Sequence, residues 1–415
     1  MFLDRPLIGI VTYIGKVPYV LMVDENMQAP PFIVGRPVTG EYFVDREEEL
    51  RRLQTLVEGV QKGASSNIAL IGLRRTGKTS ILGNLEYLLN SNKKIIPVIV
   101  DCYGIAAKSR LAKVLVDTAI QNYVRKTGDN AFLNRITKAI GEAAKSAMAR
   151  ISEVKFAEFS VKLKDKNIEE DSLLEEALQY METLAVEKDV FFVVMLDEFQ
   201  DVIRWGDDTL KRIRTIVQSQ KRVCYVLSGS ATSIMRDLVY KKQSPFYRQL
   251  VEIPIKKLDK AISIDFLKKR FNCAEMEAKD SVIEKIAARS DGYPDYLQRL
   301  GLELYLSIGQ GHSIAEEQVD KAYENIVVGL DGEFDNYLRN FSPLEREILV
   351  ALAIGEIQPS EVARAVRKPI VNISKTLTKL MNYSIIERPM KGQYRITDPV
   401  FSDWLNRRFG AVTQE

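Results

Sequence analysis

The sequence predicts an α/β protein with a parallel sheet covered by helices on both faces, then a helical segment and a small domain that ends in a β-hairpin. Short, uniformly apolar runs alternate with stretches of helical periodicity between residues 67 and 256, which is typical of strands buried on both faces. After about Lys257 the strand-like runs stop, and a strand–turn–strand pattern returns only near residue 385. A chain of 415 residues exceeds one hydrophobic core, so we expect two to three domains.

Composition narrows the functional classes. The 59 basic and 56 acidic residues give a net charge of +3, so any nucleic-acid surface must be local. Three scattered cysteines (Cys102, Cys224 and Cys273) predict neither a disulfide framework nor a zinc site. The single histidine, His312, excludes most histidine-based metal and triad chemistry. With no signal peptide and no apolar run near the roughly 18 residues that span a bilayer, we expect a cytoplasmic protein.

The N-terminal region, residues 1–40, is predicted to contain a β-hairpin and an irregular arm. Residues 7–23 are rich in β-branched and aromatic residues with glycine and proline between them, which favours two short strands. We expect them to pack beside the main sheet. Residues 29–40 hold three prolines and two glycines. A helix is expected to follow, with Asp45 as its N-cap and Leu50 and Leu53 on its apolar face.

A core at 41–256 is predicted to carry five buried strands. Helices are expected between them, including one at about 172–186, and residues 154–166 alternate enough to suggest a short inserted strand or hairpin. The apolar runs that predict the five strands are 67–71, 95–100, 190–196, 222–227 and 251–255.

The first of these strands runs into Gly72-Leu-Arg-Arg-Thr-Gly-Lys-Thr79, a phosphate-binding P-loop. Glycines let the backbone N–H groups turn inward at a helix N-terminus and form an anion site. Lys78 would reach the β- and γ-phosphates of ATP, and the Thr79 hydroxyl would ligate Mg²⁺. A strand before the motif and a helix after it argue against a chance match on a surface loop. The expected nucleotide contacts are Gly72, Arg74, Arg75, Thr76, Gly77, Lys78, Thr79 and Ser80.

An acidic pair at the end of a second strand completes this pattern. The run 190–196 delivers Asp197 to the carboxyl edge of the sheet, where it can hold Mg²⁺. Glu198 is then the candidate general base for an attacking water. The alternative is that Asp197 caps the next helix and Glu198 is a solvated charge.

Ser228-Gly-Ser230 ends the next strand. A polar side chain there would lie between the P-loop and the acidic pair and could sense the γ-phosphate, a role we assign to Ser228. The competing interpretation is a helix N-cap for residues 231–239. Both hold if Ser228 senses and Ser230 caps.

Together these motifs resemble the archaeal ATPase family within the AAA+ and STAND-related P-loop NTPases, which have an ASCE-type sheet. The matching pieces run in order along most of the chain. They are Pro31–Gly35, Phe43–Glu47, Gly72–Thr79, Leu196–Phe199, Ser228–Ser230, Ser244–Arg248, Gly292–Pro294 and Tyr394–Trp404.

The resemblance implies further roles. Phe43, Val44 and Arg46 would lie near the adenine, and Pro294 would close over the base from a helical lid at 257–332. Arg248 resembles an arginine that meets the phosphates within the chain or across a subunit boundary of a homo-oligomer. The sequence departs from the family pattern at Asp45, where glycine is frequent, and in lacking a glycine just before Arg248.

Residues 335–415 predict a winged helix-turn-helix. Helices are expected at 344–352, at 359–366 with Ser360 as N-cap, and at 369–381. Strands at 385–388 and 393–396 would flank the turn of the wing. Such a third helix can enter the major groove of DNA.

The candidate DNA contacts lie on that third helix, just before it, and in the wing. Lysine and arginine can contact phosphates, while asparagine can contact base edges. Glu361 and Glu387 dilute the patch, and winged helices also serve as protein-docking modules. The candidates are Lys368, Asn372, Lys375, Lys379, Arg388 and Lys391.

Two functions follow. The first is an ATPase that uses ATP and Mg²⁺ to change its grip on DNA. The second is a signalling or scaffold switch in which nucleotide sets the oligomeric state and the winged helix binds a protein or holds the off state. A metabolic kinase fits less well, because no acceptor pocket is evident and the acidic pair suits water as nucleophile.

Overall fold

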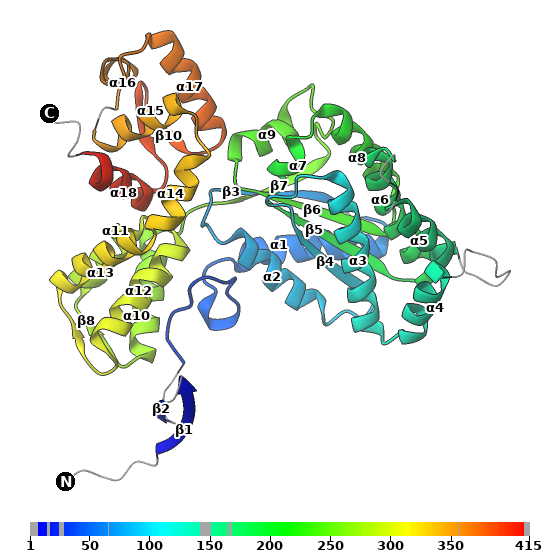
Figure 1. Cartoon of the computed structure of the whole chain (residues 1–415), viewed down its shortest axis with the longest axis horizontal. Helices are drawn as coiled ribbons and strands as arrows, with labels where there is room; N and C mark the ends of the chain where they lie inside the picture. The colour runs from blue at the N-terminus through cyan, green and yellow to red at the C-terminus, as the bar shows by residue number, and fades with distance from the viewer. Residues whose placement is uncertain are drawn as a thin grey trace.

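A computed structural model describes residues 7–14, 17–24, 29–64, 66–141, 151–163, 165, 168–355 and 357–410. The N-terminal hairpin is confirmed: β1 (Leu7–Ile14) pairs antiparallel with β2 (Val17–Asp24). These two strands form a sheet of their own, separate from the main sheet beside which we expected them to pack. Figure 1 shows this hairpin away from the rest of the chain.

The centre of the molecule is a five-stranded parallel sheet in the order β4-β5-β6-β3-β7, and all five predicted strands are present. The strand that leads into the P-loop is therefore separated from the acidic strand by β6. The carboxyl ends of all five strands meet at one edge. The strands are β3 (Asn67–Gly72), β4 (Ile95–Asp101), β5 (Phe191–Asp197), β6 (Val223–Gly229) and β7 (Leu250–Ile255).

Alternate residues of each strand point to opposite faces of the sheet, and both faces are buried. On β5, Val193 and Met195 belong to one hydrophobic cluster and Phe192 and Val194 to another. The first cluster packs under α1 (Glu47–Glu58) and α2 (Lys78–Leu89). The second packs under helices on the other face: α3 (Lys108–Thr127), α6 (Glu170–Lys188) and α8 (Asp207–Ser219) (Figure 1).

The strand or hairpin expected within 154–166 is wrong. Residues 151–162 form α5 (Ile151–Lys162), which follows α4 (Asn130–Gly141). Phe156, Phe159 and Leu163 all pack toward the core, a spacing that suits one face of a helix. The ring of Phe156 lies 6.1 Å from that of Tyr180 on α6. Packing against α6 therefore decides in favour of a helix.

Two expected N-caps are also wrong. Asp45 has φ 49° and gives no capping bond; α1 begins after Arg46. That left-handed backbone explains why a glycine would suit position 45. Ser360 lies inside α16 (Pro359–Ala365), which begins after Gln358. The N–H of Gln358 donates to the Glu361 carboxylate at 2.9 Å.

Helices dominate the chain after β7. The short helices α7 (Gln200–Ile203) and α9 (Thr232–Tyr240) precede it. After it come α10 (Lys260–Cys273), α11 (Asp280–Ser290), α12 (Pro294–Ile308), α13 (Glu316–Gly329) and α14 (Asp331–Arg339). The expectation that strands disappear here needs one amendment, because β8 (Glu277–Ala278) and β9 (Ser313–Ile314) form a two-residue parallel pair.

The winged helix follows α14. Its helices are α15 (Pro343–Ala353), α16, α17 (Ile370–Asn382) and α18 (Pro399–Phe409). The wing is the antiparallel pair β10 (Ile386–Met390) and β11 (Gln393–Ile396). The three predicted helices, α15 to α17, and the wing are thus present in the predicted order, and α18 follows them as a fourth helix.

The lid helices and the winged helix share one hydrophobic cluster, and we call residues 258–409 the C-terminal body. Phe334 of α14 contacts Phe401 and Trp404 of α18 with ring centroids 5.2 and 5.7 Å apart. Phe32 of the N-terminal arm is buried in the same cluster against Gly301, where any Cβ would collide with the Phe32 ring. The arm is therefore anchored in the C-terminal body.

Within the described ranges, no helix combines the length and the apolar character needed to cross a membrane.

Candidate nucleotide site

The P-loop joins β3 to α2 and is closed by its own side chains. Gly77 takes φ 90°, a conformation that favours glycine. The Thr76 hydroxyl donates to the carbonyl of Leu73 at 2.8 Å, and the Lys78 ammonium donates to the same carbonyl at 2.8 Å. Burial lowers the pKa of Lys78, while nearby Glu198 and Asp197 act in the opposite direction. An anionic phosphate would offset the desolvation of this ammonium.

The acidic strand lies within hydrogen-bond reach of the P-loop helix. The Thr79 hydroxyl donates to Asp197 Oδ2 at 2.6 Å, and Asp197 is buried. A hydroxyl and a carboxylate in contact at a phosphate site are the oxygen ligands that Mg²⁺ prefers. The donor set predicted for the metal, Thr79 and Asp197, is thus brought together.

Ser228 ends β6, between the P-loop strand and the acidic strand. Its side chain is fully buried, and its Oγ finds no hydrogen-bond partner in the described part of the chain. A buried hydroxyl without a partner costs stability. A phosphate oxygen or an ordered water of a bound nucleotide would satisfy it, so the site fits that group.

Glu198 is held by two neighbours. It has φ 49°, a strained backbone for a non-glycine residue. Its Oε2 accepts a hydrogen bond from the Gln200 amide and another from the Ser230 hydroxyl at 2.8 Å. The Gln200 amide also donates to Ser230 Oγ at 3.2 Å and accepts from the Ser230 N–H at 3.2 Å. Ser230 therefore does not cap α9, whose N-cap is Ala231 with no side-chain bond.

The P-loop opens onto a cleft of about 460 Å³ between the core and the C-terminal body, within the roughly 300–1,000 Å³ usual for small-molecule sites. Phe43, Val44 and Pro294, predicted to surround the adenine, all line it. Pro294 begins α12 after Gly292, which has φ 71° and whose carbonyl accepts from the N–H of Leu258 at 2.8 Å.

The arm that forms one wall is tied to both bodies. Ser80 Oγ accepts from the N–H of Val38 at 3.1 Å. On the other side, the buried Gln298 accepts from the N–H of Ile33 and donates to the carbonyl of Tyr42, both at 3.0 Å. Two residues expected to contact nucleotide thus also hold structure: Ser80 here, and Arg46, whose guanidinium donates to the carbonyl of Lys256 at 2.6 Å.

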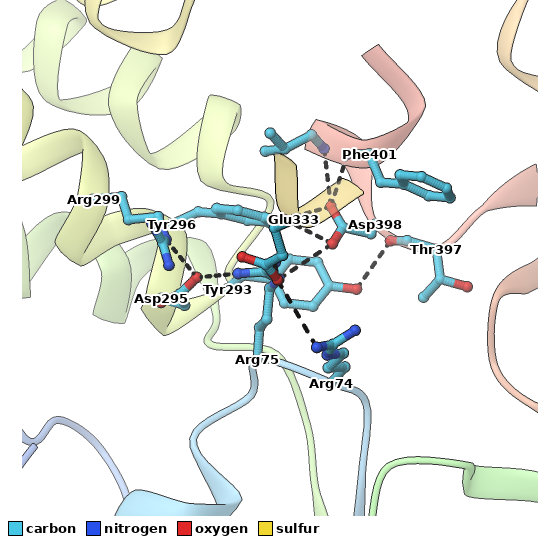
Figure 2. A network of polar contacts seen from close by, with 11 residues as sticks. Arg74, Arg75, Tyr293, Asp295, Tyr296, Arg299, Glu333, Thr397, Asp398 and Phe401 are labelled. Carbon is cyan, nitrogen blue, oxygen red and sulfur yellow. Dashed lines mark hydrogen bonds and ion pairs between the residues drawn. The ribbon is translucent and has the colours of Figure 1, made fainter. Parts of the chain in front are cut away.

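Arg74 and Arg75 lie in the P-loop, but their side chains turn toward the C-terminal body (Figure 2). The Arg75 side chain is 9% exposed, on a backbone with φ 65°. Its guanidinium contacts Asp295 at 2.7 Å and Glu333 at 2.6 Å, and its Nε lies 3.4 Å from Asp398. Arg74 lies 3.9 Å from Glu333. In this conformation the side chains of Arg74 and Arg75 are therefore engaged with the C-terminal body, and the predicted phosphate contacts of the pair would be made by their backbone N–H groups.

Arg248 is not brought to the cleft. It is exposed in the loop between α9 and β7, with its guanidinium 5.1 Å from the ring centroid of Tyr247, and it is not among the residues that line the cleft. A contact with phosphates within the chain gains no support from this placement. A role across a subunit boundary stays a prediction.

The candidate DNA contacts are exposed, with one distinction. Asn372 and Lys375 lie on the exposed face of α17, and Lys368 is exposed just before that helix. Lys379 instead forms an ion pair with Glu345 of α15 at 2.8 Å. Its positive charge is therefore partly neutralised within the protein. In the wing, Lys391 is exposed and the guanidinium of Arg388 lies 5.9 Å from the ring centroid of Tyr394.

Sequence reasoning missed four residues of this region: Gln200, Asp295, Gln298 and Glu333. Gln200 follows the acidic pair by two positions and Asp295 follows Pro294, so proximity in sequence to recognised motifs was a usable signal for both. Gln298 and Glu333 carry no local signal, because their partners lie more than 250 residues away.

These features define the class: a parallel sheet with a P-loop, an acidic strand separated from it by one strand, and a helical and winged-helix appendage are the fold of a P-loop NTPase. The family is equally clear. Residues 43–300, more than half of the chain, match the model of an ATPase domain found predominantly in Archaea. The chain belongs to this ATPase family.

Individual relatives are distant. A Methanocaldococcus jannaschii protein named as an uncharacterized HTH-type transcriptional regulator is 21% identical over 374 residues, which cover 86% of this chain and 87% of the relative. A Walker-type ATPase of Pyrococcus abyssi is similar in structure, with TM-score 0.63, 24% identity and coverage of 88% and 96%. The ORC1 protein of Aeropyrum pernix, solved in complex with DNA, has TM-score 0.50, 17% identity and coverage of 90% and 95%. The structural likenesses show the fold.

Proposed function

We propose that this chain binds ATP with Mg²⁺ in the cleft, hydrolyses it with water as nucleophile, and couples the nucleotide state to DNA binding by its winged helix. The observation that carries the ATPase part is the contact of Thr79 with Asp197 at 2.6 Å beside the buried Lys78. The orphaned hydroxyl of Ser228 lies at the end of the strand between them.

Each residue has a defined task in this proposal. Lys78 exchanges its bond to the Leu73 carbonyl for the β- and γ-phosphates. Thr79 and Asp197 would hold Mg²⁺, which neutralises charge on the phosphates. Glu198 orients the attacking water and accepts its proton. In the present structure its Oε2 is bonded to Gln200 and Ser230, so turnover requires that at least one of these bonds exchange for the water.

The ATPase part has a direct test. Lys78→Ala removes the only ammonium that lines the cleft in the described chain, and we expect it to abolish ATP binding in a titration with a fluorescent ATP analogue. Lys78→Arg is the comparison variant, because it keeps the positive charge but replaces the compact ammonium with a planar guanidinium. It should bind ATP more tightly than Lys78→Ala does. Wild-type affinity in Lys78→Ala would contradict the assignment.

DNA binding is supported by the exposed cations Lys368, Lys375 and Lys391, and by the names of two relatives, one an HTH-type regulator and one a protein solved with DNA. The test is affinity for duplex DNA as a function of salt. Lys375→Ala should weaken binding to all sequences and lower the salt slope by about one. Unchanged affinity in this variant would remove α17 from the proposed interface.

One observation favours a second function, a nucleotide-dependent switch that docks a protein. Ile370 and Val371, at the start of α17, are 51% and 74% exposed, and exposed apolar residues suit a protein partner better than a phosphate backbone. Replacing both with serine separates the two functions: DNA affinity should be retained if DNA is the partner. ATPase rate with and without duplex DNA, measured beside molecular mass in each nucleotide state, distinguishes them further.

A further inference from the structure

The structure assigns Arg75 a role beyond nucleotide binding: it is a positioning residue for which a bound triphosphate and the C-terminal body compete, so ATP binding loosens the docking of the winged helix on the core. This inference rests on the proposed binding of ATP at the P-loop. Three structural features carry it.

The first is the location of Arg75. Its backbone belongs to the P-loop, while its side chain lies among three carboxylates of the C-terminal body: Asp295 of α12, Glu333 of α14, and Asp398 at the start of α18 (Figure 2). One guanidinium from the phosphate site thus forms ion pairs with both the lid and the winged helix. The guanidinium also lies 5.2 Å from the ring centroid of Tyr296, whose hydroxyl donates to Asp398 at 2.6 and 2.7 Å.

The second feature is the sign of the charges. Asp295, Glu333 and Arg75 line the same cleft as Lys78 and Thr79. A triphosphate is a polyanion, so it attracts Arg75 and repels the carboxylates that hold it. Both effects weaken the same ion pairs, and the Arg75 side chain, which is only 9% exposed, is where charges act most strongly on one another.

The third feature is the rigidity of what would move. The lid and winged helix share one hydrophobic cluster, including the rings of Phe334, Phe401 and Trp404. Loss of the Arg75 contacts would therefore move the two together, as a body. A second contact reports this motion: the hydroxyls of Thr232, at the start of α9, and Ser384, just after α17, lie 2.7 Å apart.

That contact lies close to the chemistry. Thr232 follows Ser230 by two residues, and Ser230 holds the carboxylate of Glu198. Ser384 follows the helix that carries the candidate DNA contacts. Separation of Thr232 from Ser384 would thus change both the position of the catalytic glutamate and the position of the DNA-binding helix.

The experiment uses this contact as a sensor in the full chain. Thr232→Cys and Ser384→Cys are combined with Cys273→Ser, because Cys273 is exposed whereas the other two native cysteines are buried. The rate of disulfide formation is measured with no nucleotide and with saturating non-hydrolysable ATP analogue, whose binding is measured separately. We expect the analogue to slow the reaction about tenfold, within the roughly 5–150-fold typical of allosteric coupling.

The matched variants test Arg75 through its partners. Asp398 caps α18, accepting from Val400 N and Phe401 N, and asparagine can cap equally well. Asp398→Asn should therefore keep the fold, slow the disulfide without nucleotide, and reduce the effect of the analogue. Glu333→Gln, at a side chain 40% exposed, should act in the same direction even if Asp398→Asn unfolds. The control is Asp335→Asn on the same helix, whose partners are Arg339 and Arg408, and it should behave as the parent.

The outcomes are distinct. Equal disulfide rates with and without bound analogue would overturn the inference while leaving the nucleotide site intact. Parent-like behaviour of both Asp398→Asn and Glu333→Gln would overturn the role of Arg75. No binding of the analogue would overturn the proposed function and, with it, the coupling.

Discussion

One glutamine makes two hydrogen bonds to the arm that walls the cleft, and we predict that Gln298→Met raises the KM for ATP with little change in kcat. Gln298 accepts from the N–H of Ile33 and donates to the carbonyl of Tyr42, both at 3.0 Å. Methionine has nearly the same length but makes neither bond. The change leaves untouched Lys78 and Glu198, which we propose act on the phosphates and on the attacking water.

The magnitude follows from these two bonds. Each contributes about 1 kcal/mol net, so together they stabilise the arm by about 2 kcal/mol. In the free variant residues 33–42 can relax away from α12, while Phe32 stays packed against Gly301, and ATP must restore their position on binding. A deficit of about 2 kcal/mol corresponds to about a 30-fold higher KM.

The assay is steady-state ATP hydrolysis over a range of ATP concentrations. Gln298→Glu provides a graded comparison, since it keeps an acceptor for Ile33 but loses the donor to Tyr42, and its KM should be intermediate. Gln243→Met is the control, because Gln243 is exposed and does not line the cleft. A KM for Gln298→Met within twofold of the parent, or an equal fall in kcat, would refute the reasoning.

Three further predictions concern the base, the lid and the winged helix. Glu198→Gln should bind ATP as the parent does but hydrolyse it at least about 100-fold more slowly, and single-turnover hydrolysis at the parent rate would rule Glu198 out as the base. Gly292→Ala should lower the free energy of unfolding by about 1–3 kcal/mol, because the added Cβ would collide with the Leu258 carbonyl and residue 292 has φ 71°. A thermal midpoint equal to that of the parent would contradict this. Lys379→Ala should lower the thermal midpoint, by loss of its bond to the buried Glu345, and reduce the salt slope of DNA binding less than Lys375→Ala does.

The arrangement of the sheet and the phosphate chemistry could be predicted from the sequence because their signals are local. Each strand is a short apolar run, and the P-loop and the acidic pair follow strands directly. Parallel strands end at one edge, so Lys78, Asp197 and Ser228 could be expected to lie near one another without any knowledge of distances.

The errors arise where the partner is distant in sequence. Residues 154–166 are compatible with either period, and packing against α6, as in the contact of Phe156 with Tyr180, selects the helix at 151–162. Ser230 has the composition of an N-cap, but the Glu198 carboxylate takes its hydroxyl. The side chain of Arg75 could not be placed, since its partners at 295, 333 and 398 belong to elements whose position relative to the P-loop no local pattern specifies.

The burial of Phe32 has a consequence for how the two bodies can move. The main chain crosses from the core to the C-terminal body near Lys256, and the arm makes a second crossing because Phe32 is seated in the C-terminal cluster while Val38 is bonded to α2. Two tethers at separate points leave rotation about the line between them as the least costly relative motion. Together they would form a hinge, and the Arg75 ion pairs are a separate contact that bridges the two bodies. An isolated fragment that begins at residue 257 would lack the N-terminal arm, so the apolar site that Phe32 fills in the C-terminal cluster would be open. A peptide spanning residues 29–44 could bind there.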